Sequence, residues 1–107
     1  MSEYNERQYR LMLAQLKRFE EGQIRLNVLV DDLEGLLNRL EGLPNSWRQA
    51  FLHEWGKLED ERAYALSENL QAFDEDTTRR LLLATSRLKL LVLEKMDDPA
   101  DGGRSGS

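Results

Sequence analysis

Residues 26–44 read LNVLVDDLEGLLNRLEGLP, and this stretch decides the fold class. Its apolar residues recur every three or four positions, which is the period of an α-helix, at Leu26, Leu29, Val30, Leu33, Leu37 and Leu40. Asp31, Glu34, Asn38 and Glu41 repeat with the same steps on the other side. This pattern predicts a helix over residues 26–41 with one buried face. Pro44 follows, and proline cannot continue the helical hydrogen-bond ladder.

Two further segments on either side of this stretch have the same period. Residues 3–21 carry an apolar stripe of Tyr9, Met12, Leu13, Leu16 and Phe19, and Gly22 is a natural stop. Residues 46–69 carry a stripe of Trp47, Phe51, Trp55 and Leu58. Ser46 followed by Gln49 fits a capping box, so we expect that helix to start at Ser46 and both tryptophans to lie in the core.

The last periodic segment starts at Asp74 or Asp76, either of which can cap a helix. Its stripe is Leu81, Ala84, Leu88 and Leu91, and Leu82, Leu83, Leu90, Val92 and Leu93 broaden it. We therefore expect this helix to be buried on more than one side. After it, residues 98–107 read DPADGGRSGS, a polar tail with nothing to bury, which predicts disorder.

Together these segments predict an all-α fold, an antiparallel bundle of four helices made of three long helices plus a C-terminal one. Apolar and polar residues do not alternate as they would in a strand, and the short connections favour antiparallel neighbours. We expect a single helical domain over residues 1–97 and a disordered tail over residues 98–107.

The composition bounds the location of the protein. The 107 residues include no cysteine, which is consistent with a reducing compartment. Residues 1–10, MSEYNERQYR, are not followed by the apolar segment of a secretory signal, and no apolar run reaches the length of about 18 residues that spans a bilayer. We therefore expect a cytoplasmic protein with no membrane partner.

The polar residues favour a protein that is not an enzyme and binds no cofactor or metal. His53 is the single histidine, and one imidazole forms neither a catalytic triad nor a metal cage. There is no glycine-rich phosphate loop. Asp31 and Asp32 are adjacent on a helix, so their carboxylates point about 100° apart.

The charge is uneven along the chain. The net charge is −5, which argues against nonspecific nucleic-acid binding, and residues 20–76 hold 14 acidic and 5 basic residues. One interpretation is that acidic and basic helices lie side by side and compensate each other. The other is an acidic face that meets a basic protein partner.

Residues 22–66, GQIRLNVLVDDLEGLLNRLEGLPNSWRQAFLHEWGKLEDERAYAL, resemble small acidic all-helical bacterial proteins of the toxin-immunity type. The arrangement is similar to that of the immunity proteins of nuclease colicins. This resemblance implies an inhibitor that covers the basic active site of a toxin. On this hypothesis we expect the partner-binding surface to combine two helices, and its residues are Asp31, Glu34, Glu41, Glu54, Glu61 and Tyr64.

The alternative hypothesis is a structural or adaptor protein that forms a homodimer through its last helix, because one partner face would not cover all of its leucines. Gly35 and Gly56 lie inside predicted helices, where each costs roughly 1 kcal/mol relative to alanine. They mark a close approach of two helices or a bend, a site where a partner packs on backbone, or nothing.

Overall fold

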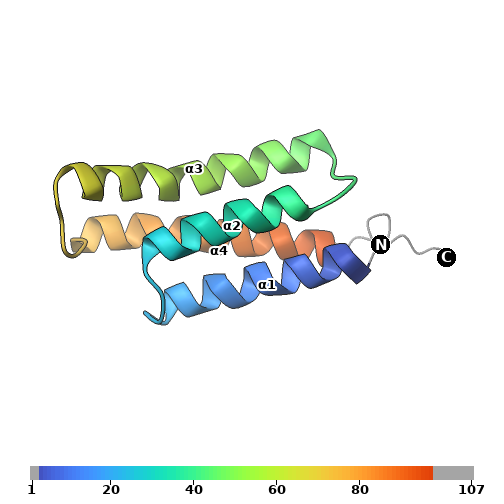
Figure 1. The fold of residues 1–107 in the computed structure, drawn as a ribbon, viewed down its shortest axis with the longest axis horizontal. Helices are drawn as coiled ribbons and strands as arrows, with labels where there is room; N and C mark the ends of the chain where they lie inside the picture. Colours follow the sequence, from blue (N-terminus) through green and yellow to red (C-terminus); the bar gives the residue numbers. More distant parts are fainter. Residues whose placement is uncertain (1–2, 98–107) are drawn as a thin grey trace.

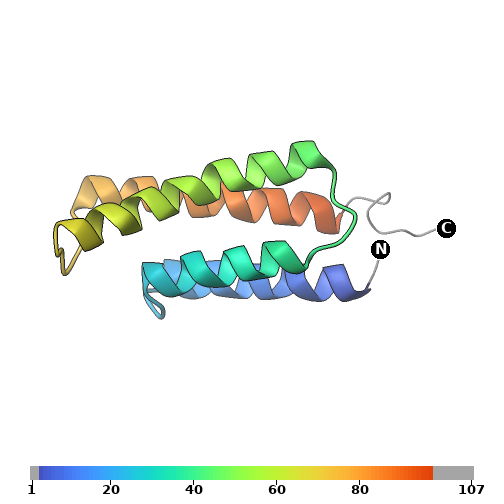
Figure 2. The same cartoon turned by 45° about the horizontal axis from the view of Figure 1, so that its top comes forward.

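The computed structural model describes residues 3–97, which form four α-helices joined by short loops (Figure 1). These are α1 (Glu3–Glu20), α2 (Leu26–Arg39), α3 (Asn45–Ser67) and α4 (Glu75–Met96). The α1–α2 hairpin forms one layer and the α3–α4 hairpin the other (Figure 2). Around the bundle, α4 packs on α1 and α2 packs on α3. The predicted antiparallel four-helix bundle is confirmed, whereas the predicted disordered tail lies outside the described residues.

The end of α1 follows the stop signal in the sequence. Gly22 has a φ of +76°, in the left-handed region that glycine adopts without a steric penalty. Its N–H donates to the Phe19 carbonyl at 3.0 Å, and the Gln23 N–H donates to the Arg18 carbonyl at 2.8 Å. These two bonds are those of a Schellman motif, which satisfies the last carbonyls of the helix.

The same motif ends α3, with an asparagine in place of glycine. Asn69 has a φ of +55°, and asparagine tolerates this conformation better than most residues. The Asn69 N–H donates to the Leu66 carbonyl at 3.2 Å, and the Leu70 N–H donates to the Ala65 carbonyl at 2.9 Å. The helix therefore ends at Ser67, two residues before the predicted end.

The end of α2 is set by a contact with α1. This helix ends at Arg39, not at the predicted residue 41, because Leu40 is already extended with a ψ of 145°. The buried Asn5 side chain donates to the Glu41 carbonyl at 2.8 Å and accepts from the Glu41 N–H at 3.1 Å. Asn5 thus supplies the hydrogen bonds that a further helical turn would have given to Glu41.

The start of α3 differs from the prediction, whereas the start of α4 agrees with it. The predicted capping box is wrong, because α3 begins at Asn45 with Pro44 as its N-cap and no side-chain cap. The Pro44 carbonyl accepts from the Arg48 N–H at 3.1 Å, so Ser46 already lies inside the helix. At α4, the Asp74 carboxylate accepts from the Thr77 N–H at 2.8 Å, which confirms Asp74 as the cap.

The core lies between the two hairpins and is formed by the predicted stripes. Its most deeply buried large side chains are Tyr9, Met12, Leu16, Leu29, Leu33, Leu37, Phe51, Leu58 and Leu88. The indole N–H of Trp47 donates to the Leu91 carbonyl of α4 at 3.0 Å, and that of Trp55 donates to the Val30 carbonyl of α2 at 2.9 Å. Trp47 is buried, whereas Trp55 is only partly buried. The tryptophans thus tie α3 to both of its neighbours.

The mid-helix glycines do not mark close helix approaches. A Cβ placed on Gly35 or on Gly56 would meet no heavy atom of a neighbouring element within 4 Å. Gly35 is also exposed on α2. The interpretation that two helices approach too closely for a side chain is therefore wrong at both positions.

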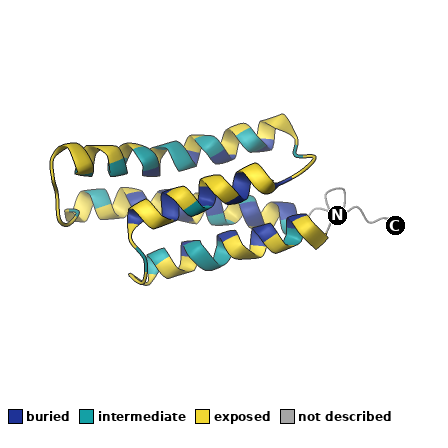
Figure 3. Ribbon diagram, in the orientation of Figure 1, coloured by how far each residue is buried: buried dark blue, intermediate teal, exposed yellow. Residues whose placement is uncertain are grey.

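The α3–α4 hairpin extends beyond the α1–α2 loop (Figures 1 and 3). The reason is length, since α3 and α4 have 23 and 22 residues, and α1 and α2 have 18 and 14. Near this tip, Tyr64, Leu66 and Leu70 are exposed. Within residues 3–97, no helix is both long enough and apolar enough to cross a membrane.

Candidate functional site

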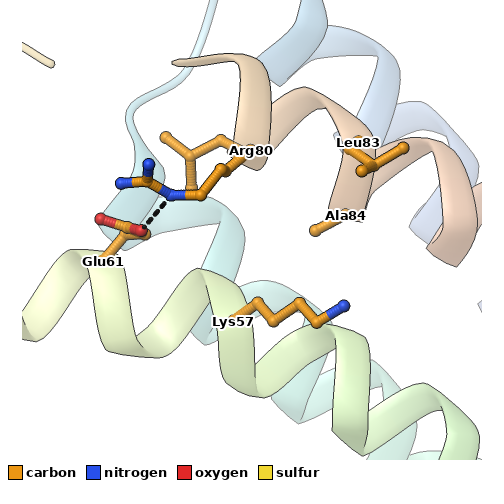
Figure 4. Close-up of a pocket in the computed structure, with 6 residues that line it drawn as sticks. Lys57, Glu61, Arg80, Leu83 and Ala84 are labelled. Carbon is orange, nitrogen blue, oxygen red and sulfur yellow. Dashed lines mark hydrogen bonds and ion pairs between the residues drawn. The ribbon is translucent and has the colours of Figure 1, made fainter. Parts of the chain in front are cut away.

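Two of the acidic residues predicted for a partner face are turned toward α4 instead. Glu54 is only 8% exposed, and its carboxylate lies 3.2 Å from the Lys57 Nζ and 3.9 Å from an Arg87 Nη of α4. Glu61, two helical turns further along α3, pairs with the Arg80 Nε of α4 at 3.1 Å (Figure 4). These carboxylates therefore help to join α3 to α4.

The exposed acidic residues of α2 face the side of α3 that is turned away from α4. Asp31 and Glu34 are near Arg62 of α3. Hydrogen bonding to Glu59 raises the pKa of the Arg62 guanidinium, and the charges of Glu59, Asp31 and Glu34 raise it further. This side of α3 faces α2, so a basic side chain already lies close to the acidic residues of α2.

The other two predicted residues are exposed but separate. Glu41 lies in the loop after α2, where Asn5 holds its backbone. Tyr64 is 58% exposed and follows Lys57 by seven residues, so it lies on the α4 side of α3. The six residues therefore do not form one continuous surface, which corrects the expected geometry. The physical reason is that residues 54, 61 and 64 share a helical stripe that is turned away from α2.

The same contacts bear on the two interpretations of the charge pattern. Three basic residues of α4 pair with acidic residues of the neighbouring helices. Arg80 and Arg87 pair with α3, and the Lys89 Nζ lies 3.0 Å from a Glu20 carboxylate oxygen of α1. The hydroxyl of Thr85, fully buried on α4, donates to the Leu82 carbonyl at 2.9 Å and also lies 3.4 Å from a Glu20 carboxylate oxygen. The structure thus has acidic and basic helices side by side, and the charges partly compensate.

His53 is exposed on α3, beside a hollow of about 410 Å³ that Ala50, Leu90 and Leu91 also line. Between residues 3 and 97, no three histidine or acidic side chains come together in a group that could hold a metal ion.

The outer side of α4 carries apolar side chains that no neighbouring helix covers. We call this the α4 leucine surface, and its members are Leu82, Leu83, Leu90 and Leu93, exposed by 38%, 52%, 65% and 39%. The expectation that α4 is buried on more than one side is wrong within a single chain. The buried side is the Leu81, Ala84, Leu88 stripe, and these leucines point away from it.

A groove runs between α3 and α4 beside this surface. One hollow of about 230 Å³ is lined by Lys57 and Glu61 on α3 and by Arg80, Leu83 and Ala84 on α4 (Figure 4). Leu90 lines the next hollow along the same helix pair. The α4 leucine surface is thus bordered by charged side chains that are already paired across the groove.

The sequence contained a signal for this surface. Leu83, Leu90 and Leu93 are spaced by seven and three residues, the steps of a second helical stripe. The sequence alone does not tell which side of an apolar helix is covered, so the predicted buried surface of the last helix includes these leucines.

Comparison of the chain with protein-family models, with curated proteins and with solved structures finds no match.

Proposed function

We propose that this protein is a non-catalytic protein-binding module of structural or adaptor type, and that its contact surface is the α4 leucine surface. The observation that supports this proposal is the exposure of Leu83, Leu90 and Leu93. Apolar surface in water costs about 25 cal/mol per Å², so a row of exposed leucines is unfavourable unless a partner covers it. Arg87 and Glu94 border the row, and a polar rim around an apolar centre is typical of protein interfaces.

A crosslinking experiment in living cells tests this proposal. A photo-crosslinking amino acid replaces Leu90 in one variant and Leu66 in a control variant. Leu66 is 69% exposed but lies near the tip of α3, away from the α4 leucine surface. We expect a protein crosslink from position 90 and little from position 66. Absence of a crosslink at position 90, or equal yields at both positions, would contradict the proposal.

A second candidate function is the immunity-type inhibitor that covers a basic toxin domain. The exposed carboxylates of Asp31, Glu34 and Glu41 favour it. Glu54 and Glu61 would not take part directly, since both pair with α4. The test uses Asp31→Lys with Glu34→Lys, because reversal of the buried Glu54 would disturb folding and not binding alone. If this candidate is right, the double variant folds normally and binds a basic partner more weakly, most strongly at low salt.

A further inference from the structure

We propose that the partner covering the α4 leucine surface is a second copy of this chain, and that the two α4 helices pair antiparallel. This inference rests on the proposed function, since it names the partner of that surface. It is carried by the spacing, the charges and the side-chain sizes along the outer side of α4.

Six exposed positions follow one another along this side, and we call them the α4 seam. They are Arg79, Leu83, Ser86, Leu90, Leu93 and Asp97. The successive steps are four, three, four, three and four residues. Alternating steps of three and four keep side chains on one narrow stripe, as in the seam of a coiled coil. The order of steps is the same when read from either end.

A seam with this symmetry is self-complementary when two copies run in opposite directions. Leu83 of one copy then lies opposite Leu93 of the second copy. Ser86 lies opposite Leu90, so a small side chain meets a large one, which is the arrangement that packs facing helices without voids. A two-fold axis creates each of these pairs twice, as expected of an isologous dimer.

The charges at the ends of the seam select the same direction. Antiparallel pairing places Arg79 of each copy, which also pairs with Asp76 of its own helix at 2.8 Å, beside Asp97 of the second copy, so opposite charges meet at both ends. Parallel pairing in register would place Arg79 beside Arg79 and Asp97 beside Asp97, and such like-charge contacts are unfavourable.

Two like-charge contacts remain in the antiparallel arrangement, one at Arg87 and one at Lys89, which flank the seam on its α3 and α1 sides. Arg87 lies on the α3 side of the seam, close to the centre of the pairing, and would approach Arg87 of the second copy. In each copy, however, the Glu54 carboxylate lies 3.9 Å from Arg87. Glu54 is shared with Lys57 at 3.2 Å, and a Glu20 carboxylate oxygen lies 3.0 Å from the Lys89 Nζ. The pairing therefore brings together partly compensated cations and not free ones.

The available area is sufficient for a dimer. The 22 residues of α4 span about 33 Å, and α4 with the adjoining rim of α3 is about 20 Å wide, since a helix with its side chains is about 10 Å across. This strip covers about 660 Å² on each copy and about 1,300 Å² in total. Specific interfaces begin at about 1,000 Å².

The first test is the oligomeric state of the purified full-length chain, measured by sedimentation and light scattering across the micromolar range. We expect a dimer for the wild type. Leu83→Ser with Leu90→Ser should give a monomer with an unchanged helical circular dichroism spectrum, whereas the matched control Leu66→Ser should stay dimeric. A wild type that is monomeric throughout, or a double variant that remains dimeric, would overturn the inference.

The second test determines the direction of the helices. The chain has no cysteine, so introduced cysteines report on one contact only. An equal mixture of Arg79→Cys and Asp97→Cys chains should form a disulfide-linked dimer on mild oxidation, and each variant alone should form several-fold less. The opposite result, with each variant alone forming the most, would show parallel pairing and contradict the proposal.

The outcomes separate this inference from the proposed function. If position 90 crosslinks in cells to a different protein while the purified chain is monomeric, the α4 leucine surface is a contact surface and only the homodimer is wrong. If position 90 gives no crosslink and the chain is monomeric, both are wrong.

Discussion

Replacing Gly35 with alanine should stabilise the protein. The position lies inside α2, is exposed, and leaves an added Cβ with no neighbouring heavy atom within 4 Å. The higher helix propensity of alanine should therefore raise the free energy of unfolding by about 1 kcal/mol, because no clash opposes it. Unfolding entropy is about 2.1 cal/mol/K per residue, or about 0.2 kcal/mol/K for roughly 95 helical and loop residues. The expected rise in Tm is thus about 5 °C.

The assay is thermal and urea unfolding followed by circular dichroism. The urea midpoint should rise with an unchanged m value, because the surface exposed on unfolding stays the same. Gly56→Ala should act in the same direction. Gly22→Ala is the matched control and should lower the urea midpoint, because a φ of +76° costs a residue with a side chain about 1–2 kcal/mol.

A Gly35→Ala variant that melts at or below the wild-type temperature would refute this reasoning. It would show that the backbone at Gly35 packs against something that a single chain does not contain, or that α2 bends there. If the variant is more stable but loses a partner in cells, the glycine is kept for that partner's approach to the backbone.

Three further predictions follow from particular contacts. Trp47→Ala should lower the free energy of unfolding by about 3–5 kcal/mol. Trp55→Ala should lower the free energy of unfolding by less, because the Trp55 ring is only partly buried. Equal urea midpoints for the two variants would contradict this difference in burial. Asn5→Ala should destabilise by about 1–3 kcal/mol through loss of two hydrogen bonds to Glu41. Asn5→Asp keeps the acceptor but sets a buried carboxylate oxygen against the Glu41 carbonyl, so it should not recover this loss at neutral pH in the same unfolding assay. Asp74→Ala should lower the Tm at neutral pH, while Asp74→Asn should not, since asparagine caps equally well. The hydrogen bond from the Thr77 N–H holds the pKa of Asp74 below its ordinary value of 3.8, so this stabilisation is complete above that pH and is lost as the pH falls through the lowered pKa. A wild-type advantage over Asp74→Ala that persists undiminished into strong acid would count against this account.

The sequence by itself determined the number of helices, their buried stripes and the ends marked by Gly22 and Asp74. This was possible because these features are local. The stripe of Leu26, Leu29 and Leu33 requires only the helical period, and Gly22 and Asp74 act on hydrogen bonds within their own turn. The lengths of α3 and α4, and hence the protruding tip, were also present in the sequence.

Tertiary structure decided what happens between helices. Glu54 looked like a solvent-facing residue because its charge suited the surface, yet the rotation of α3 turned it toward Arg87. The end of α2 depends on Asn5, which bonds to the backbone of Glu41, 36 residues further along the chain. Neither contact has a local signature, since each depends on which sides of two helices meet.

The side of α4 that the bundle covers was decided in the same way. Leu81 and Leu90 are equally apolar, and the sequence gives both a helical stripe. Only the packing of α1 and α3 against one side buries Leu81 and leaves Leu90 65% exposed. Hydrophobicity fixes how strongly a side chain favours burial, but the geometry of the neighbouring helices fixes which side chains the chain buries within itself and which remain for a partner.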